Sequence, residues 1–144
     1  MRRKILVIHG PNLDILGKRE PEIYGTTTLE EVNLMMKKRA DELKIETVFF
    51  QSNHEGDIID RIAGADEDMI IINPAGLTHT SVCLLDALSA YKGTVVEVHM
   101  TNILAREDFR RDSLTSRAAF GVICGFGTSS YLLALEAAAE NDQR

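Results

Sequence analysis

Cysteine is scarce in this chain: only Cys83 and Cys124 occur among its 144 residues, far apart and without a CxxC pair. Two isolated thiols do not provide the framework of paired cysteines that stabilises small secreted domains. The pattern is typical of a protein kept in a reducing compartment. We therefore expect two buried thiols and a cytoplasmic location.

Long apolar runs and an excess of positive charge are also missing. The basic start, Arg2 to Lys4, resembles the first part of a signal peptide, but only Ile5–Ile8 follow before His9. That run is too short for a signal peptide or a membrane span. The formal net charge of −6 makes binding to nucleic acid or acidic membranes through an overall field unfavourable. We expect neither partner, and an anionic ligand would need a local cluster of donors.

The common cofactor motifs are absent. Gly10 to Lys18 superficially resembles a phosphate loop, but the second glycine, Gly17, comes too late, and Arg19 stands where a serine or threonine should bind magnesium. No GxGxxG follows the first apolar run, His54 begins no HExxH, and no carboxylate–histidine set has a recognisable metal spacing. We therefore expect no metal and no nucleotide cofactor, which leaves acid–base chemistry.

Five short apolar runs recur about every 25 residues. They are rich in Ile, Val or Phe, as expected of strands buried on both faces of a parallel sheet. The predicted strands are Ile5–His9, Ile45–Phe50, Met69–Asn73, Thr94–His99 and Gly121–Cys124.

Helical patterns lie between these runs. Thr28 and Glu31 have the spacing of a helix-initiating capping box, and Ser52 and Glu55 repeat it before the next helix. Helix ends are expected near Gly64 and Gly93. The first helix has a single apolar stripe, formed by Leu29, Val32, Met36, Ala40 and Leu43.

Two further helices are expected around Leu84–Leu88 and over Tyr131–Ala139. The chain contains no repeat, linker or low-complexity stretch. Five strands alternating with helices predict an α/β fold, a flavodoxin-like doubly wound five-stranded parallel sheet, with residues 1–144 forming a single domain.

Polar side chains gather where the predicted strands end. All four histidines, His9, His54, His79 and His99, follow or close such a strand. Ligands of open parallel sheets bind outside the carboxyl ends of the strands. One histidine there would more often be structural, but four at one edge favour a functional site.

Glu97, His99 and Thr101 alternate along the fourth strand, so they share one face if the strand persists. A carboxylate beside an imidazole fixes the protonated nitrogen and favours the charged ring, which suits a general acid. The alternative is a structural hydrogen-bond cluster at the strand end. Arg106 and Arg110 lie four residues apart and would face one anion if helical, or else form a solvated face paired with neighbouring carboxylates.

The segment from Gly17 to Gly25 is polar, bounded by glycines, and leaves the first strand at the candidate site. Such a loop could close over a ligand. It contains Tyr24 and Arg19. A tyrosine is a poor base at neutral pH unless a nearby cation stabilises the phenolate, and Arg19 is a candidate for that cation. The alternative is that Tyr24 only anchors the loop.

Several motifs together identify a family. In chain order they closely resemble type II 3-dehydroquinate dehydratases, over Lys4 to about Ala138. The matching segments are Gly10–Leu13, Arg19–Gly25, Gln51–Gly56, Asn73–Pro74 with Thr78–Ser81, Glu97–His99 and Arg106–Arg110.

The resemblance implies a flavodoxin-like subunit that dehydrates 3-dehydroquinate to 3-dehydroshikimate by anti elimination through an enolate, in the shikimate pathway. It also implies that no lysine Schiff base is needed. By position, Tyr24 is implied to be the base and Arg19 the cation that favours its ionised form. Asn12 is implied to hold a water at the enolate oxygen. His99 is implied to be the acid, with Glu97 behind it.

The resemblance further implies a set of groups that hold the substrate. Asn73, His79 and Arg110 are implied to bind its hydroxyls and carboxylate, and Met100 and Thr101 to hold the carboxylate through backbone N–H groups and the threonine hydroxyl. Asp86 matches a family residue that reaches a neighbouring subunit. Homododecamers built from four trimers are implied.

Two departures from the family pattern concern the loops: Asp14 stands where asparagine is frequent, and Ala75-Gly76 inverts the usual order. Neither removes a catalytic group. Two other functions remain open. One is a non-catalytic module that binds a related cyclic hydroxy acid, and the other is a different lyase or isomerase acting on such a compound.

Overall fold

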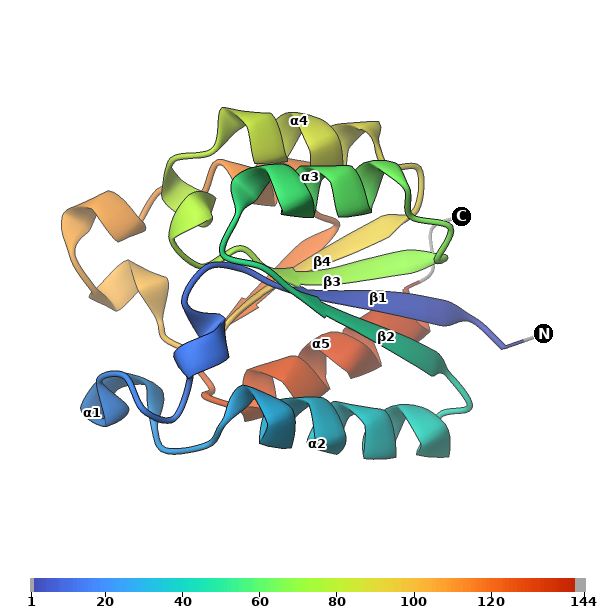
Figure 1. The fold of residues 1–144 in the computed structure, drawn as a ribbon, viewed down its shortest axis with the longest axis horizontal. Coiled ribbons are helices and arrows are strands. Elements are labelled where there is room, and N and C mark those ends of the chain that lie inside the picture. Colours follow the sequence, from blue (N-terminus) through green and yellow to red (C-terminus); the bar gives the residue numbers. More distant parts are fainter. Residues whose placement is uncertain (1, 142–144) are drawn as a thin grey trace.

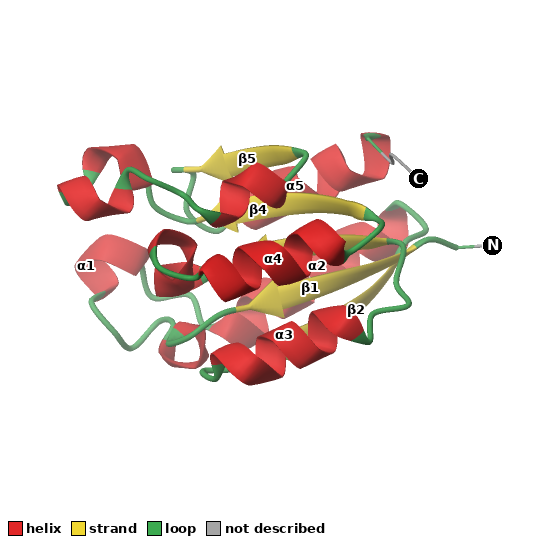
Figure 2. Ribbon diagram, turned by 90° about the horizontal axis from the view of Figure 1, so that it is seen from above, coloured by secondary structure: helices red, strands yellow, loops and turns green. Residues whose placement is uncertain are grey.

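A five-stranded parallel sheet forms the centre of the computed structural model, which describes residues 2–141. The strand order is β2-β1-β3-β4-β5 (Figure 2). This is the flavodoxin-like order, so the predicted fold class is confirmed. The predicted strand bounds agree within one residue at each end. The strands are β1 (Lys4–His9), β2 (Glu46–Gln51), β3 (Met69–Asn73), β4 (Thr94–His99) and β5 (Gly121–Cys124).

Helices cover both faces of the sheet (Figure 1). Helices α2 (Leu29–Glu42) and α5 (Ser129–Glu140) pack on one face, and α3 (Glu55–Ala63) and α4 (Val82–Ala90) on the other. Alternate residues of each central strand enter one of two apolar clusters, one beneath each helix pair. The strands therefore read as continuous apolar runs, because neither face meets water.

The start of α2 confirms the predicted capping box. Thr28 Oγ1 accepts a hydrogen bond from the Glu31 N–H at 3.2 Å, and Glu31 accepts one from the Thr28 N–H at 3.4 Å. The predicted apolar stripe buries Val32, Met36 and Ala40 against the sheet.

Two other local predictions are wrong. Ser52 and Glu55 do not form a capping box: Ser52 Oγ accepts from the N–H of His54, and Glu55 accepts from Ser81 Oγ at the start of α4, at 2.5 Å. Glu55 is therefore used to join two helices. Gly93 does not end α4, which stops at Ala90 because the chain turns into an extended residue there.

The thiols also differ from expectation. Cys83 is exposed on α4 and Cys124 is half-buried, and both are free. Helix α4 buries Leu84 and Leu88, and Cys83 lies off that buried face. Within residues 2–141 no helix combines the length and apolar character needed to cross a membrane.

The segments that follow the strands carry short helices at the carboxyl end of the sheet, on the left in Figure 1. Helix α1 lies there, together with the segment from residue 103 to 110, whereas the 3-10 helix of residues 115 to 118 packs beside α4. These short elements are α1 (Pro21–Tyr24) and the 3-10 helices Leu13–Ile15, Ala75–His79, Ile103–Ala105, Asp108–Arg110 and Thr115–Ala118.

Candidate active site

A cavity of about 150 Å³ opens at the carboxyl end of the sheet. Its wall comes from the segments that follow β1, β3 and β4, so side chains distant in sequence meet there. Nine of the residues expected in a site line it: Asn12, Arg19, Tyr24, Asn73, His79, His99, Met100, Thr101 and Arg110. Arg106 completes the group of three arginines around the opening.

Glu97 lies behind His99, outside the cavity lining. The two side chains project from the same face of β4, and His99 Nε2 is 2.8 Å from Glu97 Oε2. Both are buried, with Glu97 fully enclosed. Burial tends to raise the pKa of the Glu97 carboxyl, but hydrogen bonds from His99, Thr115 and Ser113 outweigh it and leave the pKa below its usual value. Since Nε2 faces this carboxylate, Nδ1 is the nitrogen available to a ligand.

Two guanidinium groups lie close to Tyr24. Arg19 and Arg106 each lie 5.4 Å from the centre of its ring, and Arg106 Nη1 donates a 3.0 Å hydrogen bond to the phenol oxygen. Arg19 also pairs with Glu20, 3.6 Å away. The expected neighbour Arg19 is thus present, but the direct partner of the hydroxyl is Arg106.

The stretch from Arg106 to Arg110, for which a helix and a solvated face were both left open, is not one helix. The chain breaks into two separate 3-10 helices here, and Arg106 is an extended residue between them. Arg110 pairs with Glu107, as the solvated-face alternative anticipated. Both arginines nevertheless line the cavity, because the chain folds back over the sheet edge.

Asn12 is held by its backbone. It adopts a left-handed conformation with φ of 71°, which asparagine tolerates, and its N–H donates to Asn53 Oδ1 at 2.8 Å. Asn53 Nδ2 also donates to Asp14 at 3.4 Å. The Asp14 carboxylate, which stands where the family often has asparagine, therefore faces this amide and does not line the cavity. Gly10 permits the close approach of two loops, because a Cβ there would lie 2.6 Å from Pro74 O.

Two supporting residues were missed by sequence reasoning. Asn53 lies in the matching segment Gln51–Gly56 but was given no role, and Tyr131, on α5, belonged to no motif. Tyr131 accepts a 2.7 Å hydrogen bond from Asn73 Nδ2, while Asn73 Oδ1 accepts from the N–H of Ala75 at 3.0 Å. Burial raises the pKa of Tyr131 to about 12, so its hydroxyl stays protonated.

The expectation that four histidines share the site is wrong for two of them. His9 is buried under α2, where Nε2 contacts Asn33 Oδ1 at 2.8 Å, and the ring stacks on Phe49. His54 is exposed at the start of α3. His9 closes β1 and His54 follows β2, but neither side chain lines the cavity. Asp86 is exposed on α4 and lies outside this cavity.

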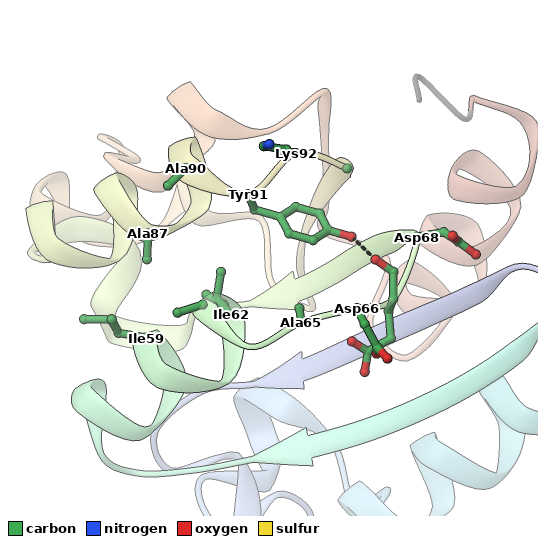
Figure 3. Close-up of a pocket in the computed structure, with 12 residues that line it drawn as sticks. Ile59, Ile62, Ala65, Asp66, Asp68, Ala87, Ala90, Tyr91 and Lys92 are labelled. Carbon is green, nitrogen blue, oxygen red and sulfur yellow. Dashed lines mark hydrogen bonds between the residues drawn. The ribbon is translucent and has the colours of Figure 1, made fainter.

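A larger hollow of about 810 Å³ lies at the opposite end of the sheet, between α3 and α4 (Figure 3). Ile59, Ile62 and Ala87 line it, and the Tyr91 hydroxyl donates to the carbonyl of Glu67 at 2.7 Å. It gathers no histidine or arginine. Within residues 2–141, no group of three or more histidine, cysteine or carboxylate side chains is arranged to hold a metal ion.

Known proteins resemble this chain along most of its length. The family model described as dehydroquinase class II matches residues 3–139. A 3-dehydroquinate dehydratase from Halothermothrix orenii is 57% identical over 136 residues, which cover 93% of this chain and 92% of the relative.

Solved structures agree with the sequence relatives. The crystal structure of type II dehydroquinase from Butyrivibrio crossotus has a TM-score of 0.92 at 40% identity, covering 97% of this chain and 99% of that one. The corresponding structure from Propionibacterium acnes has a TM-score of 0.93 at 38% identity, covering 98% and 99%. This chain therefore belongs to the class II dehydroquinase family.

Proposed function

We propose that this protein dehydrates 3-dehydroquinate to 3-dehydroshikimate by anti elimination of water, as a step of the shikimate pathway. Family membership supports the reaction, and the cavity supports the roles assigned below. The observation that carries the proposal is the presence, in one cavity, of a phenol flanked by two guanidinium groups and an imidazole supported by a buried carboxylate.

Tyr24 serves as the base. Its phenolate removes a proton from the carbon beside the substrate ketone, and the electron pair left behind forms an enolate. Arg106 and Arg19 stabilise the phenolate, the first through a hydrogen bond and the second across the ring. Asn12 holds a water against the enolate oxygen. Fixed donors of this kind supply a large share of the stabilisation in such eliminations.

His99 serves as the acid. When the enolate collapses, a carbon–carbon double bond forms and the carbon–oxygen bond of the leaving hydroxyl breaks. The proton on Nδ1 passes to that oxygen, which departs as water. Glu97 stabilises the positive charge on the imidazole before transfer and fixes the ring orientation. A positioned acid or base typically contributes about 10²–10⁴-fold to the rate.

The remaining cavity residues hold the substrate. Asn73, His79 and Arg110 bind its hydroxyls and carboxylate, and the backbone N–H groups of Met100 and Thr101, with the threonine hydroxyl, also hold the carboxylate. These groups all line the same cavity. The acid, the base and the cations are all side chains of the protein, so this account requires no cofactor.

Incubation with 3-dehydroquinate tests the reaction, because the conjugated product absorbs ultraviolet light and the substrate does not. We expect the absorbance to rise. Binding by calorimetry without product would instead support a non-catalytic module. Rapid conversion of another cyclic hydroxy acid, with 3-dehydroquinate a poor substrate, would support a different lyase or isomerase.

We also propose a cytoplasmic homododecamer of four trimers, in which Asp86 reaches the active site of a neighbouring subunit. The exposure of Asp86 outside its own cavity is consistent with that role, and two free thiols are consistent with a reducing compartment. Asp86→Ala should weaken substrate binding or trimer cohesion. Unchanged kinetics and unchanged mass by light scattering would contradict this part of the proposal.

A further inference from the structure

The segment from Asp112 to Thr115 lies beside both histidines of the cavity. Its backbone contacts the segment that carries His79, and two of its side chains contact Glu97, the partner of His99. The carbonyl of Asp112 lies 2.8 Å from His79 Nδ1, and the N–H of Leu114 donates to the carbonyl of Thr78 at 2.8 Å. Ser113 and Thr115 reach Glu97 instead. This segment was not part of any motif that pointed to the site.

Three donors surround the Glu97 carboxylate. His99 Nε2 and Ser113 Oγ approach Oε2 at 2.8 and 2.9 Å, and the Thr115 hydroxyl donates to Oε1. Glu97 and Thr115 are fully buried, so water does not satisfy the carboxylate. Oε2 therefore accepts from both the imidazole and the Ser113 hydroxyl, and Oε1 accepts from the Thr115 hydroxyl.

The direction of the hydroxyl bonds is fixed by the local turn. Ser113 Oγ already accepts the N–H of Ser116 at 3.0 Å, so its own hydrogen is free to point at Glu97. The other near neighbour of the Thr115 hydroxyl is this same serine oxygen, 3.5 Å away. Two hydroxyls that donate to a buried carboxylate favour its charged form. The depressed pKa of Glu97 agrees with this arrangement.

We propose that Ser113 and Thr115 are positioning residues for the elimination: they hold Glu97 as an oriented acceptor for His99 Nε2–H, which leaves Nδ1 directed at the leaving hydroxyl. The inference rests on the proposed role of His99 as the acid. Neither residue lines the cavity, so neither contacts the substrate. Their effect on the reaction passes through the imidazole.

Thr115 offers a matched pair of substitutions. Thr115→Val keeps the shape and removes the hydroxyl, whereas Thr115→Ser keeps the hydroxyl and removes a methyl group. A charge-assisted hydrogen bond is lost only in the first, so we expect kcat to fall about ten- to hundredfold in Thr115→Val. The KM should stay within about twofold of the wild type, because substrate contacts are intact. Thr115→Ser should retain kcat within about threefold.

A role in packing alone predicts the opposite order, because a buried threonine tolerates valine better in shape than serine. Equal losses in the two variants, or a Thr115→Val variant with wild-type kcat, would overturn the inference. Ser113→Ala independently tests the hydrogen bond to Glu97 Oε2, and this variant should also have a lower kcat. Its control is Ser116→Ala, which removes the hydrogen bond from Ser116 Oγ to the carbonyl of Ser113 in the same turn without reaching Glu97, and kcat should not change.

A readout without turnover separates this inference from the proposed function. In protein labelled with ¹⁵N-histidine, the His99 ring signals are assigned by their loss in His99→Ala. These signals should match the wild type in Thr115→Ser and shift in Thr115→Val, because the carboxylate that accepts Nε2–H loses a hydrogen bond and its fixed orientation. Unshifted signals in Thr115→Val would overturn the inference even in an active enzyme. A wild type that does not convert 3-dehydroquinate would contradict the proposed function instead.

Discussion

Arg106 donates a 3.0 Å hydrogen bond to the hydroxyl of Tyr24, although 82 residues separate them in sequence. Arg19, the nearer residue in sequence, lies over the ring and also pairs with Glu20. The hydroxyl oxygen carries the charge of a phenolate. Arg106 is thus the cation in direct contact with the atom that would become negative in the proposed mechanism.

We predict that Arg106→Gln lowers kcat about ten- to hundredfold, because a charge-assisted hydrogen bond to the phenolate is lost. Arg19→Gln should lower kcat less. Initial rates at saturating substrate measure both effects. Arg111→Gln is the control, since Arg111 is exposed, pairs with Asp108 and does not line the cavity. A wild-type kcat in Arg106→Gln together with an inactive Arg19→Gln would transfer the role to Arg19.

Stability should depend on pH through His9, which is only 1% exposed. Burial lowers its pKa to about 4 from the ordinary 6.5, despite the hydrogen bond to Asn33. Between these values the unfolded chain binds more protons, so the free energy of unfolding rises with pH. Above pH 6.5 His9 causes no loss of stability. As the pH falls toward 4, the free energy of unfolding decreases by up to about 3 kcal/mol through this residue.

Urea unfolding at a series of pH values measures this slope, and His9→Gln should remove most of it. His54→Gln is the matched control, because His54 is exposed, and its slope should equal that of the wild type. The depressed pKa of Glu97 adds a loss of stability only below the ordinary value of 4.5, at the acidic end of this range and beyond it. A His9→Gln variant with an unchanged slope above pH 4.5 would contradict the prediction.

Ala75 should be a strained residue. Its φ of 53° lies in the left-handed region, where a side chain costs about 1–2 kcal/mol, and glycine would carry no such cost. Ala75→Gly should therefore stabilise the protein by about 0.5–1 kcal/mol after the greater entropy of the unfolded glycine is subtracted. Its N–H bond to Asn73 remains possible.

The midpoint of urea unfolding reports the change. Ala119→Gly provides the comparison, because Ala119 has an ordinary extended backbone with φ of −91° and ψ of 146°. That substitution should destabilise the protein. If both alanine-to-glycine changes destabilise it equally, the strain assigned to Ala75 is absent.

The sheet could be predicted from the sequence because a strand that is buried on both faces needs a continuous run of apolar residues. Met69–Asn73 and Thr94–His99 are observed with the predicted bounds. Because parallel strands carry their carboxyl ends to one edge, His79 and His99 could also be expected in one site. The alternation of Glu97 and His99 was sufficient to predict their contact.

Other contacts could not be predicted, because they depend on how irregular segments fold back. The hydrogen bond from Arg106 to Tyr24 joins two such segments. No periodic pattern in the sequence marks the interruption between the two 3-10 helices at Arg106 or the course of the loop after β1. His9 ends a strand like His99, yet its ring turns beneath α2. Thr115, at the start of a 3-10 helix, and Ser113, in the loop before it, reach Glu97 from a segment that carries no motif.

The central claim is that a phenol and an imidazole in one cavity carry out the elimination, and Tyr24→Phe tests it most directly. The decisive measurement is the rise in ultraviolet absorbance with 3-dehydroquinate for Tyr24→Phe, beside wild type and Tyr91→Phe, which loses a phenol hydroxyl at the other end of the sheet. We predict that Tyr24→Phe loses turnover at least about 10²-fold while still binding substrate, and that Tyr91→Phe keeps it. Wild-type turnover in Tyr24→Phe would contradict the account.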